Sequence, residues 1–120
     1  MAETPVLDRT VIDALRALTP PGEPDVLAEV LKVFLDQMPP RMRRLRNAWA
    51  AGDIQEAQRT AHSLKGSAGN IGARRLFEVC SQLEEQARPG TLPGARHLVA
   101  ALGAEFDKVE AEIRRLLASG

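Results

Sequence analysis

The chain has 120 residues, 44% of them hydrophobic, and its 16 basic and 16 acidic side chains give a net charge of zero. This length accommodates one domain with one apolar core, and the lack of net positive charge argues against charge-driven binding to nucleic acid or to an anionic membrane. Because only three Phe, one Trp and no Tyr are present, aliphatic side chains must fill the interior, as is typical of helical bundles.

The single cysteine and the N-terminal residues indicate where the chain resides. Cys80 has no second cysteine to pair with, which excludes an internal disulfide and favours a reducing, cytoplasmic setting. The first residues lack a basic segment followed by an apolar run, and no stretch reaches the roughly 18 apolar residues of a membrane span. We therefore expect residues 1–120 to form one cytoplasmic domain that makes no membrane contact.

Clusters of Pro, Gly and Asn divide the chain into about six segments, each with helical periodicity. In chain order, we expect helices at residues 8–18, 25–38, 40–51, 54–70, 73–88 and 95–117. Pro39 and Pro40 separate the second helix from the third, although Pro40 also suits a first helical turn, so the two could form one kinked rod. Asp53 and Glu56 form a D-x-x-E pattern, which typically begins a helix.

Long amphipathic helices joined by short turns pack as antiparallel neighbours. The sequence therefore predicts an all-α fold, an antiparallel four-helix bundle with a short additional N-terminal helix that covers one end. Every predicted helix carries apolar residues at spacings of three and four, as a core-facing stripe requires.

The segment 54–70 carries the residues with chemical potential. Its apolar stripe is Ile54, Ala57, Ala61, Leu64, Ala68 and Ile71. At about 100° per residue, four other residues share a second, exposed face, namely His62, Lys65, Gly66 and Gly69. A neutral imidazole keeps a nucleophilic lone pair near neutral pH, and a lysine one turn away can offset the charge of a phosphoryl group.

The two glycines need a reason other than helix formation, because each costs about 1 kcal/mol relative to alanine inside a helix. Gly66 and Gly69 lie one and two turns beyond His62. Without Cβ atoms at these positions, another protein can approach the imidazole closely, as an in-line phosphoryl transfer requires.

Residues 62–73, HSLKGSAGNIGA, closely resemble the H-x-x-K-G-[SA]-[SA]-x-x-x-G signature of histidine phosphotransfer (HPt) domains of multistep phosphorelays. The chain is similar to the hybrid-kinase or stand-alone type over nearly its whole length. The resemblance implies that His62 is phosphorylated on Nε2 by a receiver-domain aspartyl phosphate and passes the group to a response regulator. It also implies a phosphocarrier without catalytic activity of its own, which works as a monomer and needs no cofactor, because Mg²⁺ belongs to the receiver.

The same resemblance implies that Glu84 lies near the histidine and orients its ring. From spacing alone, Glu84 could equally pair with Arg88, four residues on. Arg74 and Arg75 open the helix after the signature and are candidate contacts for an acidic receiver pocket, although a solvated face is an equally good interpretation.

The remaining candidates favour simple structural interpretations. His97 has no chemical partners nearby and is expected to be solvated, whereas Cys80 lies in an apolar stripe and is expected to fill the core. The two histidines form no H-x-x-x-H or E-x-x-H pair, so a metal site is not expected. The competing hypothesis is a helical docking module that binds receiver domains or a kinase without exchanging phosphate.

Overall fold

The computed structural model describes residues 5–119, which form five α-helices and one short 3₁₀ helix and contain no strand. The elements are α1 (Arg9–Ala17), α2 (Val26–Ala51), α3 (Ile54–Asn70), α4 (Arg74–Gln86), η1 (Pro93–Ala95) and α5 (Arg96–Ala118). The predicted all-α fold is confirmed.

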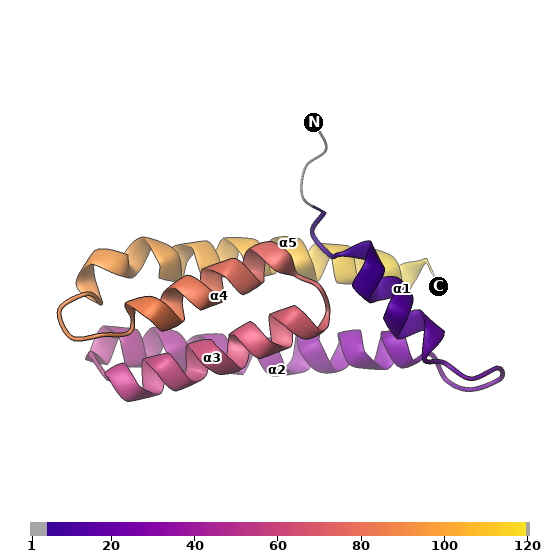
Figure 1. The fold of residues 1–120 in the computed structure, drawn as a ribbon, viewed down its shortest axis with the longest axis horizontal. Coiled ribbons are helices and arrows are strands. Elements are labelled where there is room, and N and C mark those ends of the chain that lie inside the picture. Colours follow the sequence, from indigo (N-terminus) through magenta and orange to yellow (C-terminus); the bar gives the residue numbers. More distant parts are fainter. Residues whose placement is uncertain (1–4, 120) are drawn as a thin grey trace.

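Helices α2 to α5 run side by side along the long axis of the molecule (Figure 1). Each runs antiparallel to the one before it, with α3 and α4 forming the near layer and α2 and α5 the far layer. The short α1 lies across the end where α2 begins and α5 finishes. The predicted four-helix bundle, with an N-terminal helix over one end, is therefore confirmed.

Aliphatic side chains from all four long helices fill the core. The largest fully buried side chains are Leu31, Met38, Leu45, Leu64, Ile71, Leu76, Leu83, Leu102, Ile113 and Cys80. Burying a side chain of this size contributes roughly 1.5–3 kcal/mol to folding. At the end opposite α1, the indole Nε1 of Trp49 donates a hydrogen bond to the carbonyl oxygen of Leu92 at 2.8 Å, which joins α2 to the segment before α5.

The prediction of separate helices at 25–38 and 40–51 is wrong, because α2 runs without a break from Val26 to Ala51 and includes both prolines. Pro39 is half-buried and Pro40 is exposed, and neither belongs to the buried stripe of α2. A proline costs least away from the buried face of a helix, because water can hydrate a carbonyl group that loses its amide partner there. The buried stripe passes through this point at Met38 and Met42. Core packing on one side therefore holds together a helix that the prolines weaken on the other.

The turn from α2 to α3 sets the register of the helix that carries the signature. Gly52 ends α2 in the left-handed conformation, with φ of 69°, which glycine adopts without a Cβ clash. Asp53 then caps α3, its carboxylate accepting a hydrogen bond from the Glu56 amide at 3.2 Å. Helix α3 thus begins where the D-x-x-E pattern indicates.

Candidate functional site

Helix α3 has a buried face and an exposed face, and His62 stands on the exposed one. Ala61 and Leu64, on either side of the histidine in sequence, are 0% exposed. The His62 side chain is 70% exposed. The amphipathic pattern that buries the stripe of α3 therefore projects the imidazole into solvent.

Glu84 of α4 links His62 to Lys65 through the two oxygens of one carboxylate. Its Oε2 lies 2.7 Å from Nδ1 of His62, and its Oε1 lies 2.6 Å from Nζ of Lys65. The histidine and the lysine stand one turn apart on α3, so a single side chain from the neighbouring helix reaches both. Glu84 therefore faces the histidine, as the family resemblance implies, and the described residues show no ion pair between Glu84 and Arg88.

The electrostatics of this triad follow from its contacts. The hydrogen bond from the Lys65 ammonium has the largest effect on the pKa of Glu84 and lowers it; burial opposes this, and the His62 ring adds a further lowering effect, so the pKa lies below its ordinary value. Glu84 is therefore ionised at neutral pH and can only accept hydrogen bonds. In the neutral ring, the proton must then sit on Nδ1, which leaves the lone pair on Nε2.

The two glycines of the exposed face have different surroundings. A Cβ added to Gly66 would meet no atom within 4 Å, so the space above this turn is open. A Cβ added to Gly69 would lie 3.4 Å from Cδ2 of Phe77, whose side chain on α4 is 39% exposed. Gly66 therefore leaves room beside His62, whereas Gly69 lets the Phe77 ring lie close to α3.

The two arginines at the start of α4 also differ in their surroundings. Arg74 donates from both Nε and Nη2 to Oδ2 of Asp8, the residue that caps α1, and the Nε bond is 2.9 Å long. The amide of Asp8 in turn donates to the carbonyl oxygen of Gly72 at 2.8 Å. Arg75 is exposed and forms no ion pair within residues 5–119. Arg74 thus has an intramolecular partner, while Arg75 has no ion pair in the described part of the chain.

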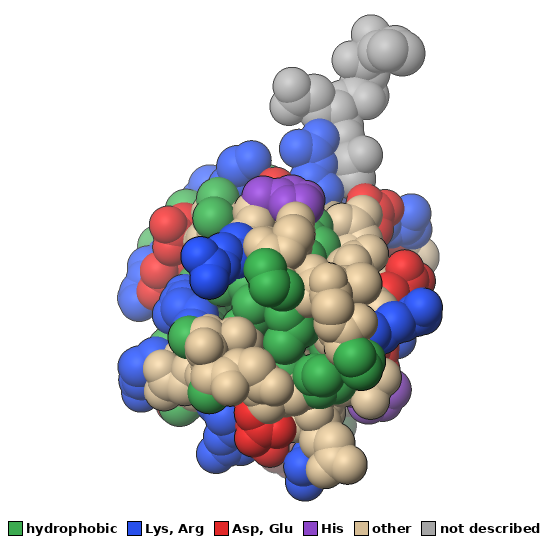
Figure 2. Space-filling model, turned by 90° about the vertical axis from the view of Figure 1, so that its left-hand side faces the viewer, with side chains coloured by type: hydrophobic (Ala, Val, Ile, Leu, Met, Phe, Trp, Pro, Cys, Tyr) green, Lys and Arg blue, Asp and Glu red, His purple; other side chains and the backbone are tan. Residues whose placement is uncertain are grey.

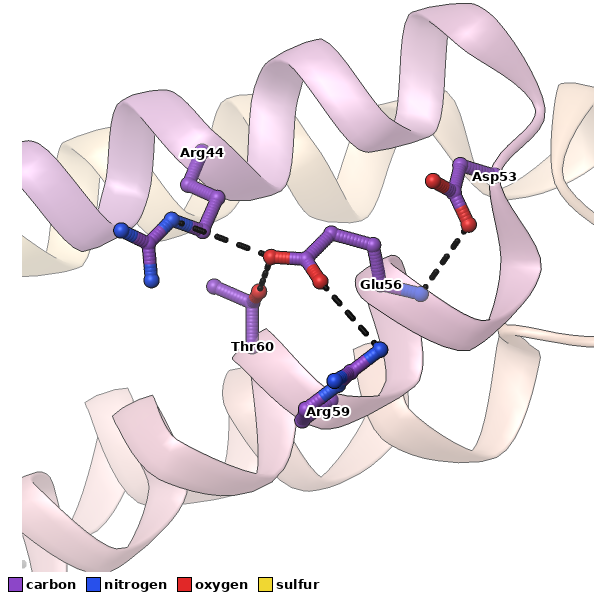
Figure 3. A network of polar contacts seen from close by, with 5 residues as sticks. All are labelled: Arg44, Asp53, Glu56, Arg59 and Thr60. Atoms are coloured by element: carbon purple, nitrogen blue, oxygen red, sulfur yellow. Dashed lines mark hydrogen bonds and ion pairs between the residues drawn. The ribbon is translucent and has the colours of Figure 1, made fainter.

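A second polar network fixes the first turns of α3 against α2 (Figure 3). The Glu56 carboxylate lies 3.7 Å from Arg44 of α2 and 3.5 Å from Arg59, and it accepts a 3.3 Å hydrogen bond from the hydroxyl of Thr60. Glu56 therefore does not turn back to complete a capping box with Asp53, whose amide instead donates to the carbonyl oxygen of Ala48. The network holds α3 in place one to two turns before His62.

Two contacts near the site were missed by the sequence reasoning. Arg41 of α2 donates to the hydroxyl of Ser67, within the signature, at 2.9 Å. Asp8 binds Arg74, as described above. Nothing in the sequence marks the first contact, since it joins residues 26 apart, but Asp8 precedes a helical pattern and could have been recognised as an N-cap.

The other candidates occupy the expected environments. His97 is exposed, and Cys80 is 0% exposed in the core, where burial raises the pKa of its thiol to about 12.

Among residues 5–119, no three His, Cys, Asp or Glu side chains are close enough to hold a metal ion. Nor does any helix in this part of the chain have the length and apolarity needed to cross a membrane.

Comparison with known proteins agrees with this fold and signature. The chain is 33% identical to histidine-containing phosphotransfer protein B (HptB) from Pseudomonas aeruginosa PAO1, with a TM-score of 0.88 over 98% of this chain and 99% of that structure. Histidine-containing phosphotransfer protein 5 of Arabidopsis thaliana is 35% identical over 89 residues, which are 65% of this chain and 54% of the plant protein. Sensor protein TorS of Escherichia coli K12 is 33% identical over 82 residues, which are 67% of this chain but only 9% of TorS.

The sequence pattern of the Hpt domain matches residues 29–116, which include the signature, Glu84 and most of the four-helix bundle. The matched region covers well over half of the chain, and the full-length structural match agrees with it. The chain therefore belongs to the histidine phosphotransfer (Hpt) domain family of two-component phosphorelays.

Proposed function

We propose that His62 accepts a phosphoryl group from the aspartyl phosphate of a receiver domain and passes it to the aspartate of a response regulator. The observation that carries this proposal is the exposed imidazole whose Nδ1 lies 2.7 Å from an ionised carboxylate. That contact occupies one ring nitrogen and leaves the lone pair of the other, Nε2, available to an approaching partner.

The transfer balances without further reactants. The Nε2 lone pair forms a bond to phosphorus, the bond between phosphorus and the aspartate oxygen breaks, and the aspartate leaves as a carboxylate. The ring keeps its proton on Nδ1, where Glu84 accepts the hydrogen bond and stabilises the positive charge that develops on the ring. Passing the group to the next receiver reverses these steps, so the chain acts as a carrier rather than as an enzyme.

Lys65 and Glu84 have linked roles in this proposal. In the unphosphorylated site the Lys65 ammonium lies 2.6 Å from Glu84 and its side chain is only 25% exposed. A phosphoryl group on Nε2 adds roughly two negative charges one helical turn away. We expect Lys65 to turn from Glu84 toward the phosphoryl oxygens, which offsets the repulsion between phosphate and carboxylate.

The partners follow from the same chemistry. Receiver domains of response regulators or of a hybrid sensor kinase would dock on the exposed face of α3, where Gly66 leaves open space and Phe77 offers partly exposed apolar surface. Arg75 has no ion pair among the described residues and is a candidate contact for an acidic receiver pocket. Mg²⁺ would be held by the receiver. We place the exchange in the cytoplasm, with the chain acting as a monomer.

The experiment incubates the purified chain with a phosphorylated receiver domain and Mg²⁺ and measures acid-labile, base-stable label on the chain. We expect label on the wild type, none on His62→Ala, and undiminished label on His97→Ala, which replaces the other histidine, also exposed. Label that persists on His62→Ala would overturn the site assignment. A wild type that binds the receiver but is not labelled would instead support the docking module without phosphotransfer.

A further inference from the structure

The end of the bundle opposite α1 carries an apolar surface surrounded by charged side chains, most of them basic (Figure 2). Two adjoining hollows lie here, with volumes of about 400 Å³ and 440 Å³. They share Trp49, Ala50 and Arg96 and together form one groove, which we call the arginine-rimmed groove. Its apolar lining includes the largely buried Trp49 and Leu92 and the more accessible Ala50, Ile54, Val99 and Ala100.

Three arginines line this groove from three different segments. Arg46 comes from α2, Arg88 from the connection after α4, and Arg96 from the first turn of α5. The described lining contains no carboxylate, and within residues 5–119 none of the three guanidinium groups forms an ion pair. By contrast, the arginines at the other end of α5, Arg114 and Arg115, are both paired with glutamates.

The floor of the groove is held in one shape. The Trp49 indole donates to the carbonyl oxygen of Leu92 at 2.8 Å, so the ring is fixed by a buried hydrogen bond. On α5, Gly103 leaves space for Arg46, whose Nη2 lies 3.7 Å from where a Cβ would stand. The Arg46 side chain therefore reaches from α2 to α5 at Gly103. A preformed apolar floor with unpaired cations at its rim favours an occupant that supplies both apolar side chains and carboxylates.

The groove is also separate from the histidine site. It lies between α2 and α5 and around the end of the bundle, whereas His62 and Glu84 belong to α3 and α4, the opposite layer in Figure 1. We propose that the arginine-rimmed groove binds an acidic, amphipathic segment of a partner protein. Its apolar side chains would lie against Ala50, Val99 and Ala100, above the largely buried Trp49 ring, and its carboxylates would meet the three guanidinium groups. The His62 face would stay open to a receiver, and the proposal does not depend on phosphotransfer.

The test selects ligands from a library of random short peptides displayed on phage, using the full chain as bait. We expect the enriched peptides to combine Leu or Phe with several Asp or Glu. Trp49 is the single tryptophan and lines the base of the groove, so a change in its fluorescence measures the binding of a synthetic copy of an enriched peptide. Reversing two rim charges in R46E/R96E should weaken binding at least roughly tenfold.

The control variant R9E/R43E changes the net charge equally, at two exposed arginines outside the groove that form no ion pair among the described residues. It should bind the peptide within about twofold of the wild type. If R46E/R96E does not fold, Arg46→Gln/Arg96→Gln takes its place, with a smaller expected loss. Enrichment of peptides without acidic residues, or equal weakening in both charge-reversal variants, would overturn the proposal. So would a Trp49 response to anionic phosphatidylglycerol vesicles with no acidic peptide enriched, which would indicate a membrane surface instead.

Discussion

At the scale of single residues, the Glu84 carboxylate has two contacts. One oxygen accepts a hydrogen bond from the His62 imidazole, and the other binds the Lys65 ammonium. Its neutral analogue separates the two effects. Glu84→Gln keeps an oxygen that can accept from Nδ1 but removes the charge, whereas Glu84→Ala removes both. The ring orientation and the phosphoryl chemistry can therefore be tested independently.

We expect Glu84→Ala to slow phosphotransfer to His62 roughly tenfold, and Glu84→Gln to slow it much less, because the hydrogen bond that fixes the ring survives. Nitrogen-15 chemical shifts of the imidazole should report the Nδ1-protonated tautomer in the wild type and in Glu84→Gln, and a mixture in Glu84→Ala. Glu85→Ala, at the exposed neighbouring position, is the control and should change neither measurement. Equal rates in all three variants would show that Glu84 has no positioning role.

Gly66 provides a second residue-scale prediction, in which stability and function change in opposite directions. A methyl group at this position meets no atom within 4 Å, so Gly66→Ala should raise the free energy of unfolding by about 1 kcal/mol. Gly66→Leu should slow transfer from a phosphorylated receiver at least roughly tenfold, because the larger side chain occupies the space that the partner needs. Thermal denaturation and transfer kinetics measure the two effects.

Gly103 supplies the matched control for Gly66, since it lies inside α5 and a Cβ there would be in ordinary contact, 3.7 Å from Arg46. Gly103→Ala should also stabilise the chain but leave the transfer rate unchanged. If Gly66→Leu transfers phosphate as fast as the wild type, the glycine has no role in access.

The sequence identified His62, Lys65 and Gly66 because all three lie on one helix, where spacing alone decides which residues share a face. It could not decide between Arg88 and His62 as the partner of Glu84. One alternative was a contact within a helix and the other a contact across the α3–α4 interface, which depends on how two helices are rotated and shifted against each other. The pairing of Asp8 with Arg74, 66 residues apart, escaped prediction for the same reason.

At the scale of elements, contacts of Asp8 join α1 to the turn between α3 and α4. The Asp8 carboxylate caps α1 by accepting a hydrogen bond from the Thr10 amide at 2.9 Å, and it also binds Arg74. The Asp8 amide donates a hydrogen bond to the carbonyl oxygen of Gly72. Gly72 has φ of +74°, and a Cβ there would lie 2.9 Å from that of Asp8. The close approach of α1 to this turn therefore requires glycine.

This junction predicts a pH dependence for α1. The Arg74 guanidinium, together with the Thr10 amide, holds the pKa of Asp8 below its ordinary value of 3.8. A lowered pKa in the folded state means that the stabilisation is complete above pH 3.8 and is lost as the pH falls through the folded value. We expect hydrogen-exchange protection of the α1 amides to fall in that acid range before protection of α3 does.

Asp8→Asn should show the same loosening of α1 at neutral pH, since it cannot form the charged pair with Arg74. Asp13→Asn is the control on the same helix, because Asp13 is exposed and forms only a 3.7 Å pair with Arg16. Protection factors of the α1 amides that are equal in Asp8→Asn and the wild type would rule out this role for Asp8.

Helix α2 shows where local rules fail at this scale. Two adjacent prolines predict a break, since each removes a backbone donor and strains the preceding turn. The break does not occur because Leu31, Phe34, Met38, Met42 and Leu45 continue one buried stripe past the prolines. The free energy gained by burying these side chains outweighs the local cost of the two prolines. A prediction from Pro39 and Pro40 alone does not include this gain. The sequence does show this apolar stripe, which is why one kinked rod over both segments is an alternative in the sequence analysis.

At the scale of the whole molecule, the zero net charge conceals an uneven distribution. Four arginines and no acidic residue lie between Gln37 and Gly52, in the second half of α2. Only Arg46 of these four lines the arginine-rimmed groove, whose other two arginines come from the α4–α5 connection and from α5, so the total charge does not describe this local surface. Amphipathic periodicity predicted the bundle, whereas the arginine-rimmed groove could not be seen before the helices were assembled.

The bundle also separates stability from chemistry, and two residues of α3 test this separation. His62 is 70% exposed and Leu64 is 0% exposed. His62→Ala should abolish phosphorylation while changing the free energy of unfolding by no more than about 0.5 kcal/mol. Leu64→Ala should lower that free energy by about 2–5 kcal/mol, because it leaves a cavity in the core, yet the fraction that remains folded should still accept phosphate on His62. Urea denaturation and the labelling assay on both variants measure the two quantities. If His62→Ala destabilised the chain as much as Leu64→Ala, the histidine would be a structural residue, and the view of α3 as a rigid support for an independent reactive group would be wrong.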